Sequence, residues 1–360
     1  MNHKLYLIFK WIVPGCTKII ARFGPKSLRK QVVQEARNKV DAVSYAYRRR
    51  ELPDLQHGVY DGGEHVRACY RLDPFEALWA VEGFGHQYAD AINEAEYDTQ
   101  KLLNREERLT WPKESMAMLH AGMGLAFAKK CFRFGLWNQP DDQTLLGAVE
   151  RCLRWCRVNA HSDYWGAAVE SIGLYIRFPL ETALLGRIAG CISTIDKEAV
   201  PYFWHGVGRA MYFAPVYFLH GMDPVMRVVK QSGLDDIERQ NILSGLAWAI
   251  TLVNMNDPQV VVEKWRHYGS HLTRDGGFSN GVLSALLVRK LVTPTYQGIQ
   301  PFLSAVAPEN CGKDDGFARR WFEQIVEPAK ILFSTNDVRS YLHEGKVGAL
   351  FRDRGLELHR

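Results

Sequence analysis

Six apolar segments, each with a glycine near its middle, recur along the chain. Their central glycines are Gly85, Gly124, Gly173, Gly208, Gly245 and Gly281, separated by 39, 49, 35, 37 and 36 residues. A glycine inside a helix costs about 0.5–1 kcal/mol relative to alanine, so its repeated use needs a compensating contact. Close packing of neighbouring helices supplies that contact. Recurrence at a nearly constant interval is typical of arrays of helical repeats.

Amphipathic stretches with helical periodicity lie between these segments. The two clearest are residues 141–158 and 235–248, the second of which opens with acidic residues suited to a helix N-terminus. We therefore predict an all-α fold, a helical-hairpin repeat array of the α-solenoid or tetratricopeptide-like kind. Each unit would hold one buried glycine-bearing helix and one amphipathic helix. Strand signals are almost absent, and the Gly, Asn and Asp content of 273–281 and 305–317 predicts loops.

The distribution of charge divides the chain. Residues 1–50 hold twelve Lys or Arg and two acidic residues, which leaves 33 basic and 38 acidic residues in the remainder. We expect a basic amphipathic segment at 1–50, a single α-helical repeat domain at 51–345 and a C-terminal tail at 346–360. Because the array is net acidic and the basic residues cluster with apolar ones, nucleic-acid binding is disfavoured.

The first 30 residues mix basic and large apolar side chains. Lys10 and Pro14 interrupt the apolar runs, which are far shorter than the roughly 20 residues that span a bilayer. The same interruption argues against a signal peptide. Cationic side chains beside Phe9 and Trp11 suit an anionic membrane surface, so we expect a cytoplasmic protein with peripheral contact at the inner membrane through residues 1–30. The alternative is that this segment docks on the domain.

The seven cysteines indicate a reducing compartment, because their number is odd and no CxxC pair occurs. Cys152 and Cys156 are expected to share a helix face, but two thiols alone make a poor zinc site. The sequence predicts no metal and no cofactor: phosphate-loop and dinucleotide-binding motifs are absent, and the glycines around GFGH and GVGRA lie in helical context.

Four segments agree in their order and spacing with the motifs of a known family over roughly residues 20–270: EGFGHQYADAI, LHAGMGLAFA, GVGRAMYF and SGLAWAITLVN. In these segments the chain resembles a bacterial family of unknown biochemical function found in enediyne polyketide biosynthesis clusters. Genes of that family commonly travel with a membrane protein and a secreted-type repeat protein, and the family also occurs in bacteria without an enediyne product. The resemblance implies an accessory role in a polyketide pathway and a membrane-protein partner from the same gene cluster.

The matched positions are glycines with acidic, basic or small neighbours. They are Glu82, Gly83 and Gly85; Glu170, Gly173 and Tyr175; Gly206, Gly208, Arg209 and Ala210; and Gly245 and Ala247. The second of these motifs usually ends in histidine in the family, and this chain has no histidine there. The family has no established catalytic residues, so the resemblance carries no catalytic assignment to this sequence.

Glu82 and His86 form the first candidate for chemistry, since residues four apart share a helix face and a carboxylate can orient an imidazole. The pair suits acid–base catalysis or half of a metal site, but no second ligand motif completes such a site. A neutral histidine with hydrogen bonds inside a helical protein explains the same pattern structurally.

A larger candidate follows from the repeat. His120 and His205 each stand just before a central glycine, so they take similar places on successive buried helices. Together with Glu170 and Arg209 they could line one groove with Glu82 and His86. Aromatic residues that could line this groove, with Trp204 and Tyr212 as the substrate-binding candidates, are Trp79, Tyr88, Tyr202, Trp204, Tyr212, Phe213 and Trp248. Repeat positions recur for packing reasons as well, and an aromatic stripe at helical spacing is more often core.

Three functional hypotheses remain open. The first is an accessory scaffold that handles a hydrophobic polyene-like intermediate or partner proteins. The second is an enzyme that acts on this intermediate by acid–base chemistry, with His86 or His205 as base and Glu82 or Glu170 as its partner. The third is a protein-binding repeat module unrelated to a metabolite.

Overall fold

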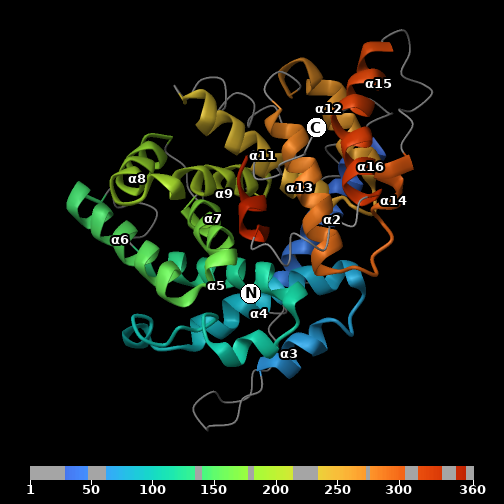
Figure 1. The fold of residues 1–360 in the computed structure, drawn as a ribbon. Helices are drawn as coiled ribbons and strands as arrows, with labels where there is room; N and C mark the ends of the chain where they lie inside the picture. The colour runs from blue at the N-terminus through green and yellow to red at the C-terminus, as the bar shows by residue number, and fades with distance from the viewer. Residues whose placement is uncertain are drawn as a thin grey trace.

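The computed structural model describes eight stretches of the chain: 29–47, 62–133, 140–176, 182–213, 234–272, 276–304, 315–334 and 346–353. Within these stretches every regular element is helical and no strand occurs, which confirms the predicted all-α class (Figure 1). None of the described helices is long and apolar enough to cross a membrane. The N-terminal residues 1–28, on which the expectation of membrane contact depends, lie outside the described part.

The longer elements follow one another through the described stretches. The α-helices are α2 (Arg29–Tyr47), α3 (Gly62–Cys69), α4 (Pro74–Ala91), α5 (Met116–Cys131), α6 (Asp142–Asn159), α7 (Trp165–Ile176), α8 (Thr182–Ile195), α9 (Val200–Phe213), α11 (Asp236–Val253), α12 (Pro258–Leu272), α13 (Gly277–Val292), α14 (Gln300–Ser304), α15 (Asp315–Trp321) and α16 (Glu327–Ser334). Shorter 3₁₀ turns are η2 (Glu94–Glu96), η3 (Glu106–Thr110), η4 (Lys113–Ser115), η5 (Ser162–Tyr164), η6 (Lys197–Ala199) and η9 (Val347–Phe351), and η8 (Phe322–Val326) is a π-helical turn.

Several helices have an aspartate at the N-cap position, where its side chain accepts a hydrogen bond from a backbone N–H group of the first helical turn. Asp73 accepts from Phe75 at the start of α4, and Asp141 accepts from Thr144 at the start of α6. At the start of α11, Asp235 and Glu238 form a reciprocal capping box. These local signals place helix starts within a residue or two of the positions that the sequence predicts.

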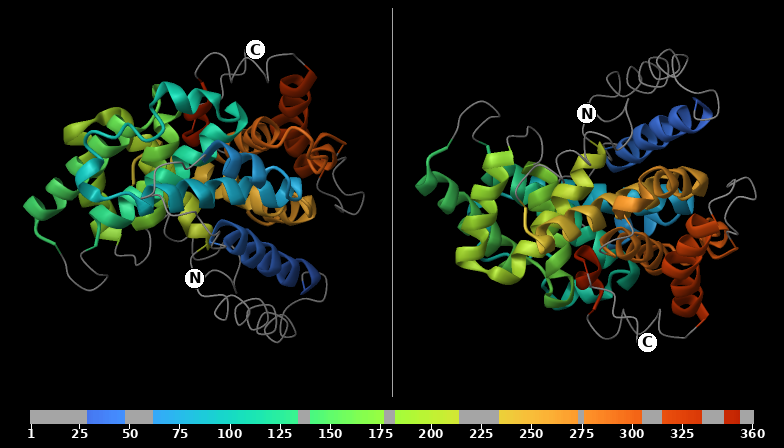
Figure 2. Two further views of the ribbon diagram at one scale, coloured as in Figure 1. Left: turned by 90° about the horizontal axis from the view of Figure 1, so that it is seen from below. Right: turned by 90° about the horizontal axis from the view of Figure 1, so that it is seen from above.

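Six helices, which we call the inner helices, make up the core. Each packs against the next in the order α4, α5, α7, α9, α11 and α13, and α2 lies against α4 (Figure 1). Figure 2 shows α2 along one side of the molecule. Helix α6 packs on α5 and α7 and buries Leu145, Val149 and Leu153, the apolar stripe expected from its sequence.

Glycines lie where the inner helices meet. A Cβ atom on any of six of them would overlap a backbone carbonyl oxygen of a neighbouring helix: Gly85 against Leu119, Gly124 against Ala168, Gly173 against Phe203, Gly208 against Ile242, Gly245 against His205 and Gly281 against Ser244. Gly122 meets α4 while Gly124 meets α7, and Gly206 meets α7 while Gly208 meets α11. Two glycines two residues apart therefore let one helix approach both of its neighbours, which offsets their low helix propensity.

Two local predictions are wrong. Residues 235–248 are not a separate amphipathic helix, because they form the first part of α11, which is buried on all sides from Asn241 to Val253. Of the loop predicted at 273–281, residues 273–275 lie outside the described residues, and 277–281 are wrong as a loop because α13 begins at Gly277. In both cases a polar or glycine-rich opening precedes an apolar helix, and burial of that helix outweighs the local signal of its first residues. Of the loop predicted at 305–317, residues 305–314 lie outside the described residues and α15 begins at Asp315.

The C-terminal residues 346–353 pack on the inner helices. Their 3₁₀ turn η9 contacts α7, α9 and α13, and it buries Val347, Leu350 and Phe351. The backbone N–H of Asp353 donates to Oδ1 of Asn241 in α11 at 2.8 Å. A segment more than 90 residues after α11 in the sequence thus covers part of the core.

Candidate functional site

Four of the predicted site residues form one buried cluster. Arg209 in α9 donates through Nη2 to Oε1 of Glu82 in α4 and, at 3.1 Å, through Nη1 to Oε2 of Glu170 in α7. The imidazole Nδ1 of His205 lies 3.2 Å from the other oxygen of Glu170. Exposure of these four side chains is 6% or less. We call Glu82, Glu170, His205 and Arg209 the charge cluster.

The local sequence explains how these groups meet. His205 and Arg209 are four residues apart and share one face of α9. Gly206 and Gly208, on either side of that face, let α9 approach α7 and α11. Because the backbones of α7 and α9 are close together, the side chain of Glu170 reaches both His205 and Arg209.

Trp248 of α11 closes one side of the charge cluster. The Cζ atom of Arg209 lies 4.6 Å from the centroid of its indole ring, and the ring of His205 meets it edge to face at 6.2 Å. Phe351 of the C-terminal segment packs on the same indole at 5.6 Å. The cluster is therefore in contact with aromatic side chains, and no member faces open solvent.

Two carboxylates share one guanidinium in the charge cluster. Burial is the largest influence on Glu82 and raises the pKa of its carboxyl group, Arg209 opposes this effect, and the charge of Glu170 adds to it. Burial acts to lower the pKa of Arg209, but the two carboxylates together raise it above its ordinary value. Arg209 is therefore charged at any pH at which the protein is folded, and Glu82 binds a proton more readily than an exposed glutamate.

His205 has the hydrogen-bonding pattern of an acid–base dyad. When its Nδ1–H donates to Glu170, Nε2 carries the lone pair of the neutral imidazole. Nε2 is buried and has no hydrogen-bond partner within the described stretches. This arrangement is chemically suited to accept a proton, but the side chain has no solvent exposure, so a reacting group can reach it only if the surrounding helices or the C-terminal segment move.

His120 has both of its ring nitrogens occupied. Nδ1 lies 2.6 Å from the carbonyl oxygen of Met116, and Nε2 accepts the backbone N–H of His161 at 3.0 Å. The ring also stacks on Tyr164. Burial lowers the pKa of His120 to about 3, so the imidazole is neutral. Its bonds connect α5 to the loop before α7, and none of them involves the charge cluster.

His86 also stands apart from the charge cluster. Burial lowers its pKa to about 4, and the carboxylate whose charge opposes this effect is Asp90. The hydrogen bond of Glu82 goes to Arg209. Of the six polar residues expected to line one groove, the structure thus joins four and leaves the two histidines of α4 and α5 in other surroundings.

The aromatic residues expected along the groove lie in the core. Trp204 is 1% exposed and packs against Phe203, and Tyr212 is 3% exposed. Trp79, Tyr88, Tyr202 and Trp248 are buried as well, and Phe213 is partly buried. In this conformation they fill the space between helices.

Tyr212 belongs to a second buried group that the sequence analysis missed. Lys264 of α12 lies 3.0 Å from Glu35 of α2, and the ammonium of Lys39 lies 3.6 Å from the same carboxylate and 3.9 Å from the ring of Tyr212. Burial opposes ionisation of Glu35, but the two lysines outweigh it and lower its pKa to about 2; burial lowers the pKa of Lys39 to about 8. The i,i+4 spacing of Glu35 and Lys39 was the available signal, although an exposed surface pair has the same spacing.

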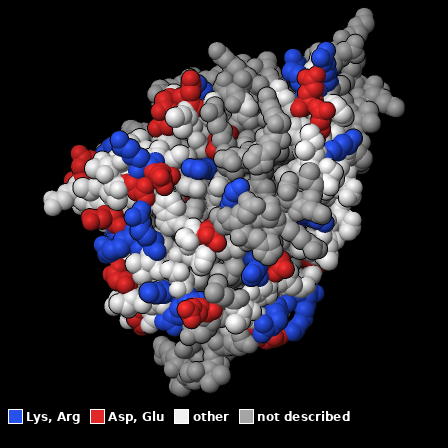
Figure 3. All heavy atoms as spheres, viewed as in Figure 1, with Lys and Arg blue, Asp and Glu red and all other residues white. Residues whose placement is uncertain are grey.

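Metal binding finds no support among the described residues, where no group of three His, Cys, Asp or Glu side chains is arranged to hold an ion. The five described cysteines are free thiols, and Cys152 and Cys156 are both buried in α6. On the described surface in the view of Figure 3, basic and acidic side chains are intermixed.

Comparison with protein-family models, with curated proteins and with solved structures finds no match to this chain. A functional assignment therefore depends on the residues themselves and on the resemblance drawn from the sequence.

Proposed function

We propose that this protein is a helical-repeat scaffold, an α-solenoid-like array of helical hairpins, that serves as an accessory protein of a polyketide or enediyne-like biosynthetic pathway. In this role it would hold a hydrophobic polyene-like intermediate or partner proteins. One observation favours a scaffold over an enzyme: four of the six polar side chains of the candidate groove bind one another inside the core. Arg209 alone connects α4, α7 and α9 through its two carboxylate partners.

The energetics of buried ion pairs support this role. Removing one partner from a buried pair typically costs about 3–5 kcal/mol, because the other charge remains without compensation. A cluster of this kind therefore holds together helices that are distant in the sequence. A protein that presents a binding surface needs such a fixed arrangement of its repeats.

The accessory role and its partners come from the resemblance and from the basic N-terminus. We propose that residues 1–30 contact the anionic face of the inner membrane and that a membrane protein from the same gene cluster is a partner. Cosedimentation with anionic liposomes tests the first part. The full-length protein should bind more strongly than a variant without residues 1–30, and salt should weaken this binding. Equal binding by the two proteins would refute the membrane contact.

The acid–base enzyme remains a second candidate, and the unpartnered Nε2 of His205 beside Glu170 is the observation that favours it. His205→Asn separates the two functions, because an asparagine amide can keep the donor to Glu170 while Nε2 is removed. The variant would be expressed in the native host after deletion of the gene, alongside the wild-type gene, with metabolites profiled and protein levels checked.

If the protein is a scaffold, His205→Asn should restore the wild-type metabolite profile when the variant protein accumulates normally. If it is an enzyme, the host strain that carries the folded variant at wild-type level should accumulate one intermediate and form no product. Arg209→Met serves as the matched structural variant, since it should fail through loss of folded protein in either case. An unchanged profile after deletion of the whole gene would contradict both pathway functions.

A further inference from the structure

A second buried arginine, Arg289 of α13, differs from Arg209 because it forms no ion pair with a carboxylate in the part of the chain that the structure describes. Its side chain has no solvent exposure. Its guanidinium lies beside two aromatic rings that also contact each other: Cζ is 5.0 Å from the ring of Phe75 and 4.8 Å from the ring of Tyr296, and the two ring centroids are 6.3 Å apart. Arg289 thereby joins the end of the row of inner helices to the start of α4.

The hydrogen bonds of Arg289 occupy one side of its guanidinium. Nη1 donates to the carbonyl oxygen of Pro74 at 3.0 Å and to that of Phe75 at 3.3 Å. Nε and Nη2 are buried and have no hydrogen-bond partner among the described residues. These two groups lie on the same edge of the guanidinium, and their parallel N–H bonds form the fork that binds a carboxylate through both oxygens.

The positive charge of Arg289 also lacks a close counter-ion among the described residues. Among the described residues no carboxylate forms an ion pair with it, and Asp73, which caps α4 through the N–H of Phe75 at 2.8 Å, attracts it only from a greater distance. Burial lowers the pKa of Arg289 to about 10, so the group is a cation at neutral pH. A buried cation without a counter-ion is costly, whereas an added anion would compensate it.

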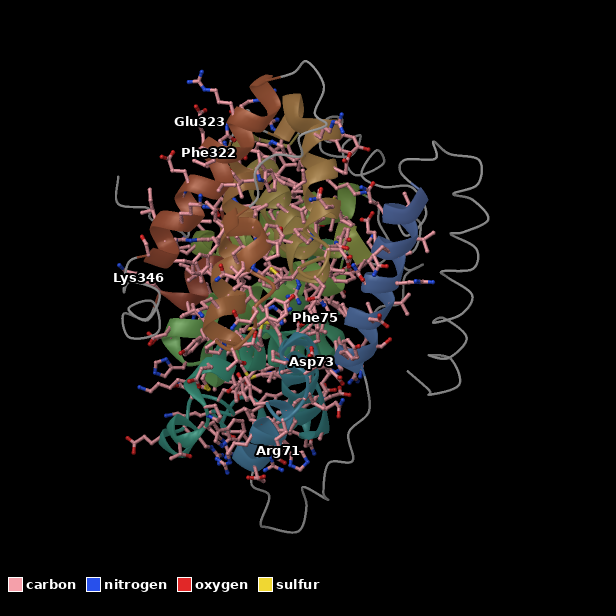
Figure 4. All side chains as sticks on the ribbon, turned by 90° about the vertical axis from the view of Figure 1, so that its right-hand side faces the viewer. Arg71, Asp73, Phe75, Phe322, Glu323 and Lys346 are labelled. Atoms are coloured by element: carbon pink, nitrogen blue, oxygen red, sulfur yellow. The ribbon has the colours of Figure 1, made fainter. Side chains whose placement is uncertain are left out.

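Arg289 lies close to the surface of the molecule. Phe75 and Tyr296 are each 9% exposed, and Pro294 and Thr295 beside them are exposed. Figure 4 shows Arg71, Asp73 and Phe75 one above another at the start of α4, on the side of the molecule that faces the viewer. Arg289 therefore contacts two side chains that reach the surface, and we expect a ligand to enter where these two rings move apart.

We propose that the Nε and Nη2 edge of Arg289 is a binding site for the carboxylate of a small organic acid. A carboxylate is planar, and its two oxygens match the two parallel N–H bonds of the fork, whereas a tetrahedral phosphate or sulfate needs more room in a buried site. The site is closed by Phe75 and Tyr296 in this structure. It is separate from the charge cluster and independent of the scaffold function proposed above.

Acetate is the probe, and acetamide is its uncharged control of the same shape. Binding to the full-length protein would be measured by calorimetry and by thermal unfolding at constant ionic strength. The ¹⁵N-labelled arginine Nε–H resonances would be recorded in parallel. We expect acetate to bind, to raise the unfolding temperature and to shift the Nε–H resonance that is absent from Arg289→Lys, while acetamide and inorganic phosphate have no such effect.

Two variants complete the test. Arg289→Lys keeps the charge but removes the fork, and it should weaken acetate binding roughly ten-fold or more. Arg71→Met removes an exposed arginine on the same side of the molecule and should bind acetate like the wild type. Equal stabilisation of the wild type by acetate and acetamide, equal binding of phosphate, or unchanged binding by Arg289→Lys would each overturn the proposal. The wild-type measurements decide the question even if Arg289→Lys does not fold.

Discussion

Arg209 and Glu82 form a buried ion pair across 127 residues of sequence. The pair connects α9 to α4, and a second carboxylate, Glu170 of α7, shares the same guanidinium. No local pattern in the sequence connects these residues, although Glu82 and Arg209 stand beside Gly83 and Gly208, where two helices approach each other closely. The charge cluster and the glycine contacts are thus two parts of one packing arrangement.

The first prediction concerns the ion pair itself. Arg209→Met should lower the free energy of unfolding by about 3–5 kcal/mol, because two buried carboxylates lose their common partner. Urea unfolding followed by circular dichroism measures the change. Arg187→Met is the matched control: its pair with Asp142 is solvent-exposed, so the loss should stay below about 1 kcal/mol. Similar losses in the two variants would show that the cluster adds no stability beyond that of a surface pair.

The glycine contacts predict opposite effects for one type of substitution. Gly122→Ala should destabilise the protein by several kcal/mol, roughly 3 or more, because its Cβ overlaps the backbone of Glu82. Gly147→Ala in α6 should stabilise it by about 0.5–1 kcal/mol, since a Cβ there meets nothing within 4 Å and alanine has the higher helix propensity. Chemical denaturation compares the two variants. Equal and small effects would contradict the close approach of α4 and α5.

The buried neutral histidine predicts a pH dependence of stability. The pKa of His120 falls from its ordinary 6.5 to about 3 in the folded protein. Between these values the unfolded chain binds a proton that the folded protein does not, so the free energy of unfolding decreases as pH falls from about 6.5 towards 3. This group alone should contribute a slope of about 1.4 kcal/mol per pH unit.

Urea unfolding at a series of pH values from 7 to 4 measures that slope. His120→Asn cannot bind the proton, and its stability should therefore fall less steeply with acid than that of the wild type. Other groups, including His86, titrate in both proteins and cancel in the comparison. Parallel curves for the two proteins would rule out a depressed pKa at His120.

The packing of the C-terminal segment predicts that Phe351 contributes to the stability of the core. Phe351 is fully buried against Trp248, so Phe351→Ala should cost about 3–5 kcal/mol. Phe322→Ala, at a position that is 45% exposed, should cost much less. Hydrogen exchange should in addition show faster exchange in η9 and the facing part of α11 for Phe351→Ala alone. Unchanged protection there would mean that the segment adds nothing to this part of the core.

The candidate site was only partly predictable. The series of glycine-bearing helices predicts that Glu82, Glu170, His205 and Arg209 line one groove, and packing of these helices does bring the four side chains together. The same reasoning predicts His86 and His120 in that groove, and this is wrong. The charge of Asp90 acts on His86, and the ring of His120 bonds to the backbone of Met116 and His161. These surroundings depend on individual side-chain directions, which the repeat does not predict. The free edge of Arg289 had no sequence signal, since its neighbours Phe75 and Pro74 are more than 200 residues away.

The sequence by itself determined the helical class, the capped helix starts and the places where helices approach closely. These properties depend on side-chain periodicity, on capping residues and on the absence of a Cβ atom, all of which act within a few residues of chain. Only the tertiary structure decided which charges meet, which aromatic residues are enclosed and what the C-terminal segment covers. Partners of that kind depend on how successive helices are rotated and stacked, and small differences at each contact add up over the row from α4 to α13.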